Sequence, residues 1–210
     1  MTLWNEKFKE MPLVAILRGL SPEEAIDVST VLVEAGIKIL EVPLNSPNPL
    51  ESISKMKAHF MDQAIIGAGT VLTGEAAKQV HDNGGELIVA PNLNADVAAM
   101  SKKCGMIYCP GILTPTEAFN ALALGADALK IFPADAHPPS YIKSIRAVLP
   151  RDTTIIPTGG VEPDTIATYY QVGANGFGAG SSLYKPGKSL NEIAEMAAKL
   201  VSATKDVIHP

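Results

Sequence analysis

One pattern repeats along the chain: a short apolar run, a turn, an amphipathic segment of about three helical turns, and then a glycine. Near-continuous apolarity is typical of a strand that is covered on both faces. The runs recur about every 20 to 25 residues, which leaves little room for long loops. Eight such runs can be counted, at 14–18, 39–42, 65–70, 87–91, 106–111, 128–133, 154–160 and 176–181.

Alternating strands and helices with short connections predict a parallel sheet, and eight such units predict a sheet that closes into a barrel. We therefore expect an α/β protein in which residues 1–210 form a single-domain (β/α)8 barrel, that is, a TIM barrel. An open doubly wound sheet is the alternative. We also expect an extra N-terminal helix over 2–10, where it can cover the barrel floor, and a longer last helix over about 190–206.

Start signals precede several of the predicted helices. Ser21 comes before Pro22 and two glutamates, and Thr114 comes before Pro115 with Glu117 three positions on. A hydroxyl at the N-cap, a proline at the first helical position and acids in the first turn all favour a helix start. We therefore expect helices that begin directly after Ser21 and Thr114.

Charge and composition exclude several classes of partner. The net charge is −5 and no run of Lys or Arg stands out, which argues against nucleic acid. No stretch approaches the ~18 apolar residues of a membrane helix, and the charged N-terminus is unlike a secretory leader. The two cysteines fit no zinc pattern, and the four histidines are dispersed. We expect a cytoplasmic protein that holds no metal.

The active site of such a barrel lies at the carboxyl ends of the strands. The candidate site residues are therefore those that end each apolar run or follow it directly: Arg18, Glu41, Asn45, Thr70, Pro91, Lys130, Phe132, Gly159, Gly160, Gly180 and Ser181.

Lys130 lies in the sixth apolar run, between Leu129 and Ile131. Side chains alternate along a strand, so if these two neighbours face the helices, Lys130 faces the barrel interior. Burial lowers the pKa of an amine, and a neutral amine can form an imine with a carbonyl. The alternative is an ammonium that reaches the barrel mouth and pairs with an acid or a phosphate.

Glu41 lies in the second run on the same face as Ile39, so alternation turns it inward as well. The second and sixth strands of an eight-strand ring lie opposite each other, and even-numbered strands share interior layers. A carboxylate across a small barrel from the Lys130 amine is a reasonable acid and base. A structural ion pair between the two is the alternative.

Arg18 and Thr70 end the first and third runs. A guanidinium at the active face suits a carboxylate or a phosphate, although an ordinary surface arginine is equally compatible with the sequence. Thr70 follows Gly69, and its hydroxyl can bond a substrate carboxylate or keto oxygen.

Glycine-rich loops end the seventh and eighth runs, as Thr158-Gly159-Gly160 and as Gly180-Ser181. Loops after these two strands, each leading into a helix, bind phosphate in such barrels. Bare backbone N–H groups and a helix N-terminus attract an anion there. Tight turns without a ligand are the alternative reading of the same glycines.

Several short motifs, spread over nearly the whole chain, resemble those of the bacterial 2-dehydro-3-deoxy-phosphogluconate/phosphogalactonate aldolase family. Each motif is weak alone, and together they are highly specific. The matching segments are Glu41-Val42-Pro43-Leu44, Gly67-Ala68-Gly69-Thr70-Val71, Ala90-Pro91-Asn92, Pro110-Gly111, Leu129-Lys130-Ile131-Phe132-Pro133, Pro157-Thr158-Gly159-Gly160-Val161 and Gly180-Ser181.

The resemblance implies a class I retro-aldol reaction without metal or cofactor, in which a sugar-acid phosphate yields pyruvate and glyceraldehyde 3-phosphate. It also implies a homotrimer. Lys130 matches the Schiff-base lysine and Glu41 the general acid/base. The matches to the phosphate site are Gly159, Gly160, Gly180 and Ser181, and the predicted substrate-binding residues are Arg18, Asn45, Thr70, Pro91, Phe132 and Thr158.

Three positions bear on which branch of the family the chain resembles. Phosphogluconate members usually carry an arginine four positions after the catalytic glutamate, where this chain has Asn45. The presence of Arg18 resembles the phosphogalactonate branch instead. Thr158 departs from that branch, because phosphogalactonate members can have an aliphatic residue at the matching position. We expect the phosphogalactonate substrate, in galactonate catabolism, with the phosphogluconate epimer or both epimers as the alternative.

Two rival functions use the same residues. A sugar-phosphate isomerase or epimerase would transfer protons through Glu41 and use Lys130 only as a charge. A non-catalytic sugar-phosphate-binding barrel would keep the phosphate loops and release no pyruvate.

Overall fold

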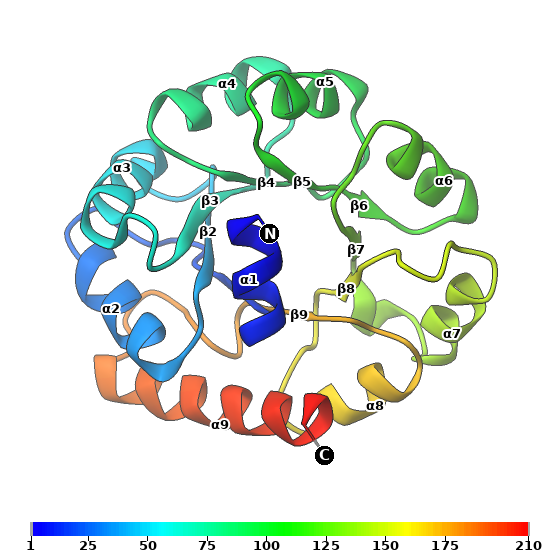
Figure 1. Cartoon of the computed structure of the whole chain (residues 1–210). Helices are drawn as coiled ribbons and strands as arrows, with labels where there is room; N and C mark the ends of the chain where they lie inside the picture. The colour runs from blue at the N-terminus through cyan, green and yellow to red at the C-terminus, as the bar shows by residue number, and fades with distance from the viewer. Residues whose placement is uncertain (1, 210) are drawn as a thin grey trace.

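The computed structural model describes residues 2–209, which form an inner ring of strands surrounded by helices (Figure 1). This arrangement confirms the predicted barrel. The strands are β1 Leu13–Ile16, β2 Ile39–Pro43, β3 Ile65–Gly69, β4 Leu87–Val89, β5 Ile107–Cys109, β6 Gly111–Ile112, β7 Leu129–Ile131, β8 Ile155–Pro157 and β9 Phe177–Ala179.

One helix crosses an end of the ring, and the others pack around its outside (Figure 1). The crossing helix is α1 Leu3–Glu10. The outer helices are α2 Ala25–Ala35, α3 Pro49–Phe60, α4 Gly74–Asp82, α5 Ala95–Lys103, α6 Pro115–Ala123, α7 Ser140–Arg146, α8 Ile166–Gln171 and α9 Leu190–Ile208, and a short 3-10 helix, η1 Ala134–Ala136, follows β7.

The strands pair in parallel in two sheets, β5-β4-β3-β2-β1-β9 and β6-β7-β8. A bridge between Thr158 and Gly178 joins β8 to β9 and closes the ring on one side. On the other side only Pro110 separates β5 from β6. The run 106–111, expected as one strand, is therefore split, because proline has no N–H to donate to a ladder. The closed ring excludes the open doubly wound sheet.

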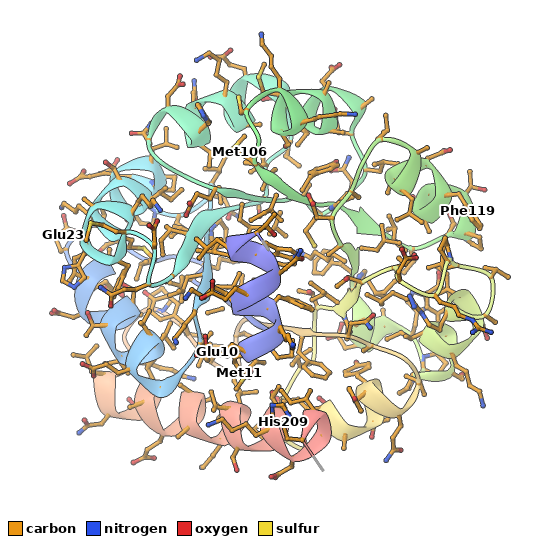
Figure 2. All side chains as sticks on the ribbon, viewed as in Figure 1. Glu10, Met11, Glu23, Met106, Phe119 and His209 are labelled. Atoms are coloured by element: carbon orange, nitrogen blue, oxygen red, sulfur yellow. The ribbon has the colours of Figure 1, made fainter. Side chains whose placement is uncertain are left out.

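Alternation along the strands creates two apolar cores. Residues such as Leu40, Leu129 and Ile131 face outward and pack beneath the helices in the larger cluster. Their neighbours Ile39 and Ala128 face inward and fill the barrel with other aliphatic side chains. Figure 2 shows the side chains between the ring and the outer helices. Because both faces of the sheet are apolar, a polar side chain on the inner face stands out.

The two terminal helices follow the prediction closely. α1 begins after Thr2, whose hydroxyl accepts a hydrogen bond from the Asn5 N–H. Trp4 on this helix packs into the inner cluster and closes the barrel floor. At the other end, α9 runs two residues past the predicted position 206, behind a capping box made by Ser189 and Glu192.

The predicted helix starts have different outcomes. Thr114 and Glu117 form a capping box, and α6 begins at Pro115 as expected. The start predicted after Ser21 is wrong, because residues 22–24 form a turn and α2 begins at Ala25. Ser21 hydrogen bonds the Glu23 carboxylate, which leaves its hydroxyl engaged away from the helix.

Candidate active site

A cleft of about 350 Å³ opens where β1, β7, β8 and β9 end. These are carboxyl ends of parallel strands, the place where barrels of this kind bind ligands. The predicted site residues that line this cleft are Arg18, Lys130, Phe132, Thr158, Gly159, Gly160, Gly180 and Ser181.

Lys130 lies on β7 between two outward-facing neighbours, so its side chain points into the barrel as alternation predicts. The residue is only 6% exposed, and its Nζ lies 4.6 Å from the centroid of the Phe132 ring. Burial lowers the pKa of this amine, while the Glu41 carboxylate opposes that shift. The site therefore favours the neutral, nucleophilic amine more than water does.

Glu41 lies on β2 and is 1% exposed. Burial raises the pKa of this carboxyl to about 7, and the nearby charges of Lys130 and Arg18 limit the rise. Within the described residues its Oε2 has no hydrogen-bond partner. A carboxyl with a pKa near neutrality can accept and return a proton at physiological pH.

Glu41, Lys130 and Thr158 line one small cavity inside the barrel. The volume of this cavity is about 10 Å³, close to what a single water molecule requires. Salt bridges in the part of the chain that the structure describes do not include a Glu41–Lys130 pair. The two groups therefore face a common space instead of neutralising each other in direct contact.

Arg18 follows β1 and is held at the rim of the cleft by a neighbouring loop. Its Nη1 donates a 2.7 Å hydrogen bond to Asn45 Oδ1. The adjacent Gly19 N–H donates to Ser46 Oγ at 2.9 Å. Asn45 therefore orients the guanidinium without neutralising its charge, and the remaining donors stay available for an anion.

The two glycine-rich loops meet on one side of the cleft. Gly159 and Gly160 both have positive φ, a backbone conformation that favours glycine. Among the hydrogen bonds within residues 2–209, none uses the backbone N–H of Gly160, Val161, Ser181 or Ser182. Unpaired N–H groups from two loops are a suitable cradle for a phosphate.

Three contributors to this geometry were missed from the sequence. Ser182 Oγ donates a 2.7 Å hydrogen bond to the Val161 carbonyl, which ties the two glycine-rich loops together. Ser46 holds the loop that carries Arg18. The only available signal was that Val161 and Ser182 directly follow predicted cradle residues, and Ser46 follows Asn45.

Four predicted residues lie outside the described lining of the cleft: Glu41 faces the inner cavity, Asn45 binds Arg18, and Thr70 and Pro91 line neither space. Thr70 ends β3 with a φ of 56°, an uncommon conformation for a residue with a Cβ, and it is half-buried. Pro91 follows β4, and its carbonyl oxygen lies against Gly111. Their predicted contacts with a substrate remain predictions.

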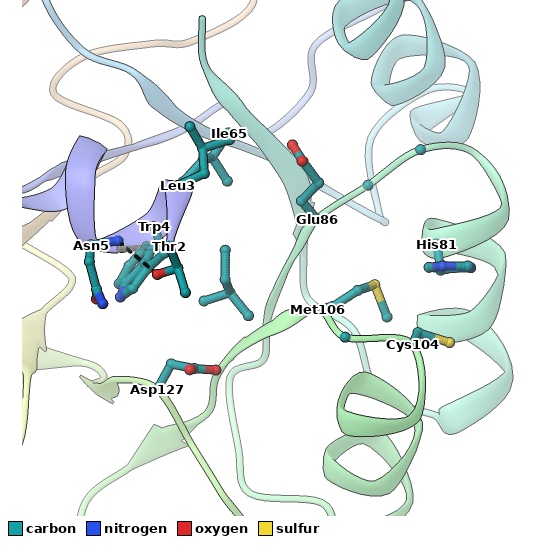
Figure 3. A pocket seen from close by; sticks show the side chains of 14 residues that line it. Thr2, Leu3, Trp4, Asn5, Ile65, His81, Glu86, Cys104, Met106 and Asp127 are labelled. Atoms are coloured by element: carbon teal, nitrogen blue, oxygen red, sulfur yellow. Dashed lines mark hydrogen bonds between the residues drawn. The ribbon is translucent and has the colours of Figure 1, made fainter. Parts of the chain in front are cut away.

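A larger cavity, of about 530 Å³, lies at the opposite end of the barrel beside α1 (Figure 3). It is lined by residues that begin or precede strands, including Ile65, Glu86 and Asp127. Barrels of this kind carry their active sites at the carboxyl ends of the strands, so the smaller cleft is the candidate active site. Within the described residues, no group of three or more His, Cys, Asp or Glu is placed to hold a metal ion. No described helix is both long and apolar enough to cross a membrane.

Comparison with known proteins gives consistent matches. The family model for KDPG and KHG aldolase matches residues 4–198. The 2-dehydro-3-deoxy-6-phosphogalactonate aldolase of Escherichia coli (strain K12) is 43% identical over 205 residues, which cover 98% of each chain. The 2-dehydro-3-deoxy-phosphogluconate aldolase of Treponema pallidum (strain Nichols) is 31% identical over 164 residues, covering 78% of this chain and 76% of that protein. A solved structure described as native KDPGal has a TM-score of 0.94 and 43% identity, over 96% of this chain and 98% of that chain.

Proposed function

Because the chain belongs to the KDPG and KHG aldolase family of metal-independent class I aldolases, we propose that it cleaves 2-dehydro-3-deoxy-6-phosphogalactonate. The products are pyruvate and glyceraldehyde 3-phosphate, and the reaction belongs to galactonate catabolism. The enzyme is a lyase that acts on small phosphorylated sugar acids. The observation that carries the proposal is that Lys130 and Glu41, both buried, face one cavity, and that Lys130 also lines the cleft that contains the two glycine-rich loops.

Lys130 forms the covalent intermediate. Its neutral Nζ attacks the C2 carbonyl, and the resulting carbinolamine loses water to give a protonated imine. The lowered pKa of Lys130 supports this role, because burial increases the fraction of amine that carries a free electron pair. The positive imine then draws electrons from the neighbouring C3–C4 bond.

Glu41 moves the protons. As C3–C4 breaks, the carboxylate accepts the proton of the C4 hydroxyl, and the aldehyde leaves as glyceraldehyde 3-phosphate. The bonding electrons pass to the imine, which becomes an enamine. Protonation of the enamine at C3 regenerates an imine, and water hydrolyses it to pyruvate and free Lys130. A proton path through one water fits the volume of the shared cavity.

The two anionic ends of the substrate bind on different loops. Arg18, oriented by Asn45, is placed to bind the keto-acid carboxylate. The cradle of Gly159, Gly160, Gly180 and Ser181 binds the phosphate through backbone N–H groups. Phe132 packs beside the Lys130 amine, and Thr70 and Pro91 contact the keto acid from the opposite rim.

Two observations support the galactonate epimer as the substrate. Position 45 holds an asparagine instead of an arginine, and Arg18 lines the cleft. The identity of 43% to a phosphogalactonate relative, against 31% to a phosphogluconate relative, points the same way. Thr158 favours the second candidate function, cleavage of both C4 epimers. It lines both the inner cavity and the cleft, where its hydroxyl can bond the C4 oxygen of the gluconate epimer and so admit this second substrate.

The test is pyruvate release from the two C4-epimeric phosphorylated substrates, followed by a coupled lactate dehydrogenase reaction. The proposal expects release from both or from the galactonate epimer alone, with a higher kcat/KM for the galactonate epimer. Cleavage of the gluconate epimer only would reverse the assignment. Saturable binding without pyruvate release would favour a sugar-phosphate-binding protein, and activity retained in Lys130→Met would favour an isomerase or epimerase.

We also propose that residues 1–210 form one catalytic domain, that the enzyme assembles as a homotrimer, and that it works in the cytoplasm. The family match over 4–198 and the closed ring support one domain. Exposed apolar side chains, including Phe119 at the outer edge of α6, supply surface for a subunit contact (Figure 2). Free thiols at Cys104 and Cys109 agree with a reducing compartment. Light scattering during gel filtration measures the number of subunits.

A further inference from the structure

The two loops that hold the ends of the proposed substrate lie next to each other. Loop 17–24, between β1 and α2, carries Arg18, and loop 180–189, between β9 and α9, carries Ser181 and Ser182. On the proposed function, the first binds a carboxylate and the second a phosphate. The distance between these loops therefore sets the length of substrate that the site can hold.

One hydrogen bond joins the two loops directly. The Tyr184 hydroxyl donates to Glu24 Oε1, across 160 positions in sequence. Tyr184 is buried at 2% exposure, so its hydroxyl has given up water for this partner. The two loops are also closely packed near this bond. A Cβ on Gly19 of the first loop would lie only 2.6 Å from Cγ of Pro186 in the second.

Tyr184 also belongs to the turn that presents the phosphate cradle. The N–H groups of Leu183 and Tyr184 both donate to the Gly180 carbonyl, at 2.9 and 3.0 Å. Lys188 Nζ donates to the carbonyls of Ser182 and Leu183 at the end of this turn, at 2.6 and 3.2 Å. The turn is thus internally fixed, and a shift of Tyr184 moves the cradle with it.

We propose that Tyr184 and Glu24 are positioning residues that fix the phosphate cradle relative to Arg18 and so select substrates by their carboxylate-to-phosphate length. Neither residue is among the described residues that line the cleft. Their effect reaches the substrate through the two loops. This inference rests on the proposed function, because it needs a ligand that is anionic at both ends.

The test compares a substrate that spans both loops with one that touches only the first. In Tyr184→Phe, which keeps the buried ring, KM for the six-carbon phosphorylated substrate should rise about tenfold while kcat stays within about twofold. The rate at which borohydride traps pyruvate on Lys130 should stay within about twofold, because pyruvate has no phosphate. Glu24→Gln keeps an acceptor for the Tyr184 hydroxyl, so this variant should have a KM near the wild-type value.

An unchanged KM in Tyr184→Phe overturns the inference, and so does an equal loss of pyruvate trapping, which indicates a general structural role. If Tyr184→Phe does not fold, Glu24→Met removes the same bond from the half-exposed partner and is judged by the same two readouts. Failure of the proposed function looks different, since the wild-type enzyme would then release no pyruvate from either epimer.

Discussion

The backbone of Gly69 lies directly against the carboxylate of Glu41. A Cβ on Gly69 would be 1.8 Å from Glu41 Oε2, far inside van der Waals contact. The two residues lie on the adjacent strands β3 and β2, with Pro43 opposite Gly69 in the parallel register. Glycine at position 69 is therefore what allows a glutamate to reach into the barrel at position 41.

Gly69→Ala should displace the Glu41 carboxylate and lower kcat by about 100-fold or more, the size of effect that loss of a positioned acid/base produces. The barrel should still fold, because the atoms displaced belong to a side chain. Gly67→Ala is the matched contrast, since its Cβ would lie 2.1 Å from the Leu87 carbonyl oxygen and must disturb the backbone. Steady-state kinetics and thermal unfolding of both variants measure the difference. Full activity in Gly69→Ala would contradict the placement of Glu41 in the chemistry.

Glu41 should make the stability of the enzyme depend on pH. The pKa of Glu41 is about 7 in the folded protein, against an ordinary value of 4.5. As pH rises, Glu41 therefore loses its proton in the unfolded chain before it does so in the folded protein. The free energy of unfolding should therefore fall between pH 4.5 and 7, by at most ~3 kcal/mol, and then level off. Glu41→Gln removes this dependence, so the variant should gain stability relative to wild type across that window. Denaturant unfolding at pH 4 and pH 8 measures the gain, and an equal difference at both values would show that Glu41 does not titrate there.

Arg18 and Asn45 should act as one unit in binding the carboxylate. Arg18→Met should raise KM for the substrate by about tenfold or more, because a charge-assisted hydrogen bond is lost. Asn45→Ala should raise KM only a few-fold, since it removes the orientation and leaves the charge. In the double variant, Asn45→Ala should add nothing further, which a double-mutant cycle measures. Additive effects would mean that Asn45 contacts the substrate independently of Arg18.

Thr158 should influence the choice between C4 epimers. Thr158→Val keeps the side-chain shape and removes the hydroxyl next to the inner cavity. The ratio of kcat/KM for the galactonate over the gluconate epimer should rise by about tenfold, the scale of one hydrogen bond. The melting temperature serves as the control for folding. A ratio equal to that of wild type would remove Thr158 from the specificity of the site.

Much of the fold was predictable because each unit carries its own local signal. Apolar runs of the right length marked the strands, and alternation correctly turned Glu41 and Lys130 inward, where they line the inner cavity. Such signals fail where a tertiary contact competes with them. Ser21 looks like an N-cap, but its hydroxyl bonds Glu23, and Glu24 accepts from Tyr184 in a distant loop.

The site was predictable in outline and not in its connections. The strand-end rule located Arg18 and the glycines of the phosphate cradle, because it depends only on which residues end each run. The bond between Arg18 and Asn45, 27 positions apart, depends on how two loops lie against each other. The same holds for Ser182 and Val161, which no spacing in the sequence connects.

The central claim is that Lys130 forms an imine with the keto acid, and chemical trapping tests it most directly. The protein is incubated with pyruvate and sodium borohydride, digested, and analysed by mass spectrometry, with Lys130→Met as the control. We expect a reduced pyruvate adduct on the peptide that contains Lys130, loss of activity in step with its formation, and no adduct in the variant. An unmodified Lys130 peptide in the wild type, or an equal adduct in Lys130→Met, would contradict the account.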